Sequence, residues 1–106
     1  MITRLISSSQ KVLDEQTASR VAEIFRCLGD ASRVRIISAL SSDEMNVGAL
    51  SEVVGISESA VSHQLRVLRQ MRLVRSRKEG RQVYYALDDE HIADLYYRGL
   101  DHVLHG

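Results

Sequence analysis

The chain has 106 residues, of which 44% are hydrophobic and 26% charged, and its formal net charge at pH 7 is zero. This composition is typical of one small globular domain and excludes an intrinsically disordered chain. No apolar run approaches the roughly 18 residues of a membrane span, and the N-terminal residues lack a secretory signal pattern. A single cysteine excludes an internal disulfide framework, so we expect a cytoplasmic protein that does not enter a membrane.

The zero net charge conceals three blocks of different sign. Residues 1–57 have a net charge of −1, residues 58–85 a net charge of +5, and residues 86–106 a net charge of −4. A basic block inside an otherwise neutral chain indicates one surface that attracts polyanions such as nucleic acid.

The sequence of the N-terminal half predicts a short arm followed by helices. Residues 1–13 are rich in serine and show no clear periodicity, so we predict a flexible N-terminal arm there and one domain over residues 14–106. Apolar residues at helical spacing predict a first helix that begins near Asp14 and ends at Gly29. Asp30 is then expected to cap a second helix.

The next two predicted helices are separated by a short turn. Asn46 is a plausible N-cap for a third helix, which ends at Gly55, where a positive φ is allowed. Ser57 is placed to cap a fourth helix over Ser57–Met71, whose apolar residues form one stripe. A helix, a glycine-containing turn and a polar helix are typical of a helix-turn-helix, although helix pairs of this kind also occur in proteins that never bind DNA.

After Met71 the periodicity changes from helical to alternating. Leu73–Lys78 and Arg81–Leu87 flank the short turn Glu79–Gly80, which predicts a β-hairpin. Its tip is basic, as in the wings that rest on the phosphate backbone, although an ordinary surface hairpin with solvated charges has the same pattern. The hairpin and the helix-turn-helix together contain the basic block, and this combination favours DNA binding.

Two groups of residues are expected to contact DNA. One lies at the start and on the polar face of the fourth helix, near the base edges, and comprises Ser57, Ser59, Ser62, His63 and Gln64. The other consists of basic side chains that would hold phosphates, namely Arg66, Arg69, Lys78 and Arg81.

The last predicted helix begins near Asp88, its expected N-cap, and has a broad apolar stripe that either closes the core or packs on a second subunit. Gly99 in mid-helix favours close contact with a second copy. His91, His102 and His105 lie on one face, but His91 and His102 are about 16 Å apart along the axis, too far to share an ion within one chain.

A second, antiparallel copy of this helix would bring the histidines together. His91 and Asp89 of one chain would then lie beside His102 and His105 of the other. One carboxylate and three imidazoles form a ligand set typical of zinc, although three solvated surface histidines are the alternative interpretation. Four protein ligands leave no position for water, so we expect a structural or regulatory site and not an enzyme such as a small zinc hydrolase.

Four segments are similar to a known family: LGDASRVRIISAL, ISESAVSHQLRVLRQMRLV, GRQVYYALDDEH and DHVLH. Over about residues 23–105 the chain resembles the ArsR/SmtB family of metal-responsive bacterial repressors. The resemblance implies a mainly α, homodimeric winged helix-turn-helix in the order α-α-α-α-β-β-α. It also implies a repressor that binds an inverted-repeat operator when metal-free and controls metal efflux or sequestration genes, with no small organic substrate.

The resemblance is closest to the zinc/cobalt-responsive branch, in which Asp-x-His and His-x-x-His on the last helix form an intersubunit site. Those positions are Asp89, His91, His102 and His105, so Zn(II) is the expected regulatory ligand, with Co(II) or Ni(II) as alternatives. The resemblance also implies that the second ring nitrogen of a metal-bound histidine, here His102, bonds to a backbone carbonyl near Arg72.

Departures from the family pattern narrow the choice of metal. The segment Met45–Gly48 lacks the thiolates that arsenic, cadmium and lead sensors use, and Cys27 is expected to pack as a small apolar residue. Two alternatives stay open. One is a nickel- or cobalt-responsive repressor of the same fold, and the other is a DNA-binding regulator whose last helix only dimerises.

Overall fold

The computed structural model describes residues 12–106 and confirms the predicted order of elements. The predicted N-terminal arm, residues 1–13, therefore lies outside the described residues except for Val12 and Leu13. Among the described residues, no helix has the length and apolar character needed to cross a membrane. The elements are α1 Glu15–Leu28, α2 Ala31–Leu40, α3 Val47–Val54, α4 Glu58–Gln70, β1 Val74–Glu79, β2 Gln82–Leu87 and α5 Glu90–His105.

Side-chain caps fix where the helices begin. The predicted N-caps Asp30, Asn46 and Ser57 each accept a hydrogen bond from a backbone N–H in the first turn of α2, α3 and α4. The predicted cap of α5 was wrong by one residue. Asp88 directly follows β2 and is held at the base of the hairpin, because its N–H donates to the carbonyl of Leu73 at 3.0 Å. The N-cap is Asp89.

The core lies between α2, α3, α4 and the hairpin. Its fully buried side chains include Ile36, Leu50, Val61, Leu65 and Leu68, and three of these lie on α4. Burying each such side chain contributes about 1.5–3 kcal/mol relative to exposure, which fixes the rotation of α4 about its axis. The opposite, polar face of α4 is therefore held toward solvent.

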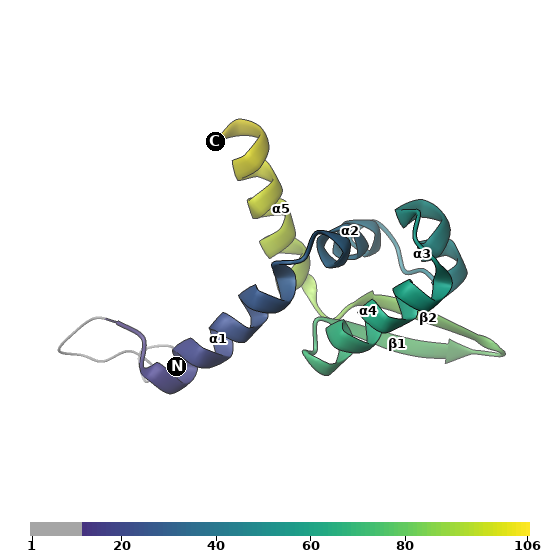
Figure 1. The fold of residues 1–106 in the computed structure, drawn as a ribbon, viewed down its shortest axis with the longest axis horizontal. Helices are drawn as coiled ribbons and strands as arrows, with labels where there is room; N and C mark the ends of the chain where they lie inside the picture. The colour runs from purple at the N-terminus through teal and green to yellow at the C-terminus, as the bar shows by residue number, and fades with distance from the viewer. Residues whose placement is uncertain (1–11) are drawn as a thin grey trace.

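Helices α1 and α5 extend away from this body in different directions (Figure 1). Their burial is small: α1 buries only Cys27, as predicted for that residue, and α5 buries none. The first half of α5 is held on α2, where the hydroxyls of Tyr96 and Ser38 are 2.9 Å apart. The second half of α5 projects free of the rest of the described chain.

Strands β1 and β2 form an antiparallel hairpin in which Val74 pairs with Leu87 and Glu79 pairs with Gln82. The turn is therefore Gly80–Arg81, one residue later than predicted, because Glu79 still belongs to the ladder. Gly80 takes the positive φ, +63°, that the turn requires.

Candidate functional site

The polar face of α4 presents most of the predicted base-reading residues. Ser59, Ser62 and His63 are exposed on it, as are the predicted phosphate contacts Arg66 and Arg69. At the start of the helix, the Ser57 hydroxyl caps Ala60 N–H at 3.1 Å. Since the apolar face of α4 is locked in the core, this set points outward as one surface, as a helix in a DNA groove requires.

Gln64 differs from the other predicted base readers. It is half-buried, and its Oε1 accepts a hydrogen bond from Arg33 Nε of α2 at 2.8 Å. Arg33 also donates from Nη1 to the Cys27 carbonyl at 3.1 Å. Arg33 was not among the predicted site residues, because its partners lie on two other helices.

The hairpin tip contains the other predicted phosphate contacts. Lys78 and Arg81 are exposed at the end of β1 and in the turn, and neither forms an ion pair with another described residue. Their charges are therefore available to a polyanion. The tip projects beyond α3 (Figure 1), where it can contact a DNA backbone.

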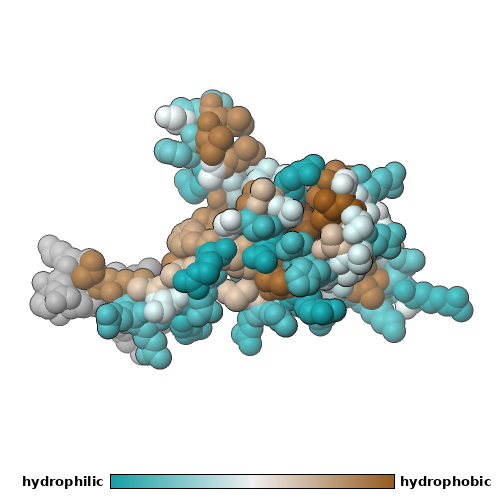
Figure 2. All heavy atoms as spheres, viewed as in Figure 1, coloured by the Kyte–Doolittle hydropathy of each residue, from teal (hydrophilic) through white to brown (hydrophobic). Residues whose placement is uncertain are grey.

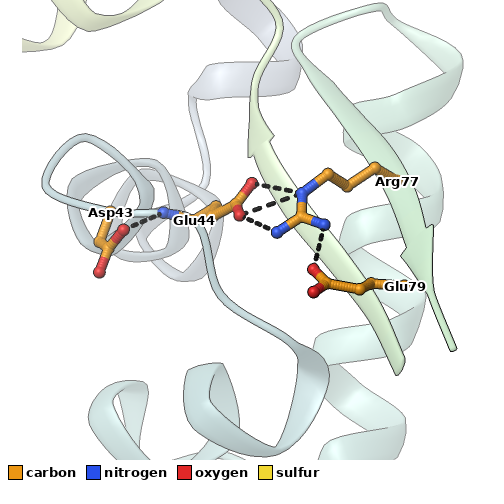
Figure 3. A network of polar contacts seen from close by, with 4 residues as sticks. All are labelled: Asp43, Glu44, Arg77 and Glu79. Carbon is orange, nitrogen blue, oxygen red and sulfur yellow. Dashed lines mark hydrogen bonds and ion pairs between the residues drawn. The ribbon is translucent and has the colours of Figure 1, made fainter. Parts of the chain in front are cut away.

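A third basic residue of the hairpin, Arg77, is engaged within the protein (Figure 3). Its guanidinium binds the Glu44 carboxylate, with Nε 3.1 Å from both oxygens, and also binds Glu79. It lies over the Tyr84 ring, 4.9 Å from the centroid. Hydrogen bonding to Arg77 lowers the pKa of Glu44, and the two carboxylates raise the pKa of Arg77.

This network ties the hairpin to the loop between α2 and α3. In the same loop Met45 forms a β-bridge with Tyr85, with N–H to oxygen distances of 3.0 and 2.8 Å. Two independent contacts therefore set the angle of the hairpin against the helices. Arg77 was missed as a positioning residue because its sequence neighbours suggested only a solvated basic strand.

The end of α4 has an unusual backbone. Arg72 has a φ of +58°, and the N–H of Leu73 donates to the carbonyl of Leu68 at 2.9 Å. These are the features of a helix C-terminal motif in which glycine normally takes the left-handed position. No hydrogen bond joins Arg72 to His102 among the described residues of one chain, so their predicted link stays a prediction that needs the dimer.

The predicted metal ligands separate into two groups at opposite ends of α5. At the start, His91 Nδ1 lies 3.4 Å from Asp89 Oδ1, which also accepts from the His91 and Ile92 N–H groups. Asp89 Oδ2 has no hydrogen-bond partner among residues 12–106. At the end, His102 and His105 line a polar depression. Within residues 12–106 of one chain, no three His, Cys, Asp or Glu side chains converge on a metal position.

Asp101 is a further residue of this site that was not predicted from the sequence. Its Oδ1 lies 2.9 Å from His105 Nδ1, one helical turn away, and both side chains are mostly exposed. A carboxylate at this position orients the imidazole and leaves Nε2 as the free nitrogen. The i, i+4 spacing of Asp101 and His105 on a predicted helix could have predicted this contact.

An apolar groove runs along α5 beside α1 and α2. It is open to solvent: Phe25 is 57% exposed and Val103 is 79% exposed. Figure 2 shows hydrophobic residues over the free half of α5. A side chain at Gly99 would meet no described atom within 4 Å. The groove is lined by Phe25, Leu28, Val34, Ile37, Ile92, Leu95, Tyr96, Gly99, Leu100 and Val103.

Comparison with known proteins identifies the family. Residues 30–76 match the family described as "Bacterial regulatory protein, arsR family". The chain is 47% identical over 93 residues to a transcriptional repressor SmtB homolog of Synechocystis sp., covering 88% of this chain and 70% of the relative. The chain belongs to the ArsR/SmtB family of metal-responsive transcriptional regulators. It is therefore a DNA-binding regulator and not an enzyme.

Solved structures of similar proteins confirm the winged helix-turn-helix. The solution structure of apo-NmtR superposes with a TM-score of 0.78 at 38% identity, covering 94% of this chain and 84% of that one. A homodimeric winged helix-turn-helix domain of Mycobacterium bovis, described as a possible ArsR-family regulator, gives 0.76 at 26% identity, with coverages of 92% and 95%.

Proposed function

We propose that this protein is a repressor that binds an inverted-repeat operator as a metal-free dimer and releases it when Zn(II) binds between the two α5 helices. The observation that carries the proposal is the placement of two exposed ligand pairs at opposite ends of one helix. Neither pair suffices for a four-ligand site, and an antiparallel second copy supplies the complement. The ligands would be Asp89 and His91 of one subunit with His102 and His105 of the other.

The donor set fits the ion. Imidazole nitrogens and one carboxylate oxygen suit zinc, and Co(II) or Ni(II) would accept the same atoms. The bound ion would supply a cross-link between subunits. Joining the α5 helices would favour a dimer geometry in which the two α4 helices no longer match successive major grooves. A bond from His102 to the carbonyl near Arg72 would carry this change to the end of α4.

Cytoplasmic location and control of metal efflux or sequestration genes belong to the same proposal. They are supported by the family and by the relative named as a cadmium resistance regulatory protein of Staphylococcus aureus, 37% identical over 91 residues. The chain has no thiol other than Cys27, which is buried, so the proposal for this protein is an imidazole-binding metal.

Metal stoichiometry tests the site. Dialysis of the purified dimer against zinc is expected to leave one ion per chain, measured by atomic emission, since each of two identical sites per dimer uses four ligands. His63→Ala on α4 is the matched control and should retain this value. A value of zero would favour the second candidate function, a regulator whose α5 only dimerises, and tighter retention of nickel than zinc would favour a nickel sensor.

Arg77 and Arg81 of the hairpin are expected to behave differently in DNA binding. Arg81→Ala should weaken binding to all sequences and reduce the slope of log affinity against log salt by about one unit, because one phosphate contact is lost. Arg77→Ala should weaken operator binding but leave the slope unchanged, since its charge is already paired with Glu44. Fluorescence anisotropy at several salt concentrations measures both. Equal slope changes would show that Arg77 also contacts phosphate.

A further inference from the structure

Gln64 is the predicted base reader whose polar group is already engaged by the protein. Its Oε1 lies 2.8 Å from Arg33 Nε, and both residues are half-buried between α2 and α4. A half-buried contact is less screened by solvent than one on the open surface. The amide orientation of Gln64 is thus set before DNA arrives.

Arg33 is itself held in place by two further hydrogen bonds. Its backbone N–H donates to the N-cap Asp30 at 3.1 Å, and its Nη1 donates to the Cys27 carbonyl at 3.1 Å. Cys27 lies in the last turn of α1, where carbonyls lack helical partners. Arg33 therefore spans from the end of α1 to the reading face of α4, and its guanidinium is not free to turn away.

The chemistry of this pair determines what Gln64 can offer a base. A guanidinium only donates hydrogen bonds, so the amide atom that faces Arg33 must be the oxygen. The amide nitrogen with its two N–H donors then lies on the other side. In the major groove guanine presents two acceptors, O6 and N7, and thymine presents the acceptor O4 and no donor. Adenine presents the acceptor N7 beside the donor N6, and pairing both needs the amide oxygen and nitrogen side by side.

We propose that Arg33 is a specificity-determining positioning residue, which makes Gln64 a donor-only reader that selects guanine or thymine over adenine at the base it faces. The inference rests on the proposed operator binding through α4 and adds the chemistry of one contact. A merely structural Arg33 would instead affect all DNA sequences alike. Base preference at one operator position therefore separates the two roles.

The test is selection of binding sites from a random duplex pool by the full-length, metal-free protein. The position that Gln64 reads is the one whose preference disappears in Gln64→Ala. Wild type is expected to select guanine or thymine there. Arg33→Met frees the amide to turn and should raise the acceptance of adenine about tenfold, within the 1–3 kcal/mol typical of one base contact. Retained zinc stoichiometry confirms that the variant is folded.

Gln64→Glu provides an independent test that keeps the Arg33 contact. One carboxylate oxygen still accepts from Arg33, and the other now accepts where the amide donated, so preference should move toward cytosine, whose N4 is a donor. If Arg33→Met fails to fold, the base preference of Gln64→Glu tests the inference by itself. Wild-type selection of adenine would overturn the inference about Arg33 but not the proposed function. Variants that bind DNA more weakly with unchanged base preferences would do the same. Failure of wild type to select any sequence would overturn the proposed function as well.

Discussion

Replacing His102 with alanine is expected to reduce zinc affinity by more than about 100-fold, because loss of a hydrogen-bonding partner of a metal ligand alone costs 10–100-fold. His102 lies at the free end of α5, far along the chain from the polar face of α4. Operator binding by the metal-free variant should therefore stay close to wild type. Competition with a chromophoric zinc chelator measures the first quantity and fluorescence anisotropy the second.

His63→Ala is the matched control for this variant. It removes an exposed imidazole from α4, so it should leave zinc affinity unchanged while altering DNA binding. The two variants thus separate the metal site from the DNA-binding surface. If metal-free His102→Ala lost operator binding, the end of α5 would have a role in DNA recognition that the proposed function does not include.

Leu100→Glu is expected to convert the dimer to monomers and to reduce operator affinity by at least about 100-fold. The side chain lines the apolar groove of α1, α2 and α5, and a carboxylate buried there without a partner is costly. Two linked recognition helices gain roughly 10²–10⁴ in avidity over one, and a monomer loses that gain. Sedimentation velocity measures the oligomeric state, and anisotropy measures the affinity.

Val53→Glu is the control for the dimer prediction. Val53 is an exposed apolar residue, 56% accessible, on α3 and outside the groove. The variant should therefore remain dimeric. A dimeric Leu100→Glu protein would mean that the subunits associate through a different surface, and the intersubunit metal site would then lack its geometry.

Local signals explain why most of the fold was predictable from the sequence. Asp30, Asn46 and Ser57 cap helices through side-chain bonds to residues three positions away, so each start is encoded within one turn. The cap of α5 was misplaced by one residue because two adjacent aspartates compete for it. A tertiary contact decides between them, since the bond from the Asp88 N–H to the Leu73 carbonyl holds Asp88 at the base of the hairpin.

Long-range contacts explain what the sequence could not predict. Arg33 bonds to Gln64, which is 31 residues away, and Arg77 bonds to Glu44, which is 33 residues away. Neither pairing can be predicted from local periodicity or from charge counts. The net charge of the basic block therefore overstates the charge available to DNA, because Arg77 is neutralised within the protein.

Titration of zinc into the complex of the protein with its fluorescent operator duplex tests the central claim most directly. One ion per chain should lower operator affinity by at least about 5-fold. Allosteric coupling free energies of roughly 1–3 kcal/mol correspond to about 5–150-fold. Linkage requires that operator DNA weaken zinc binding by the same factor. Operator affinity that stays unchanged or rises as zinc saturates the dimer would contradict the proposed mechanism.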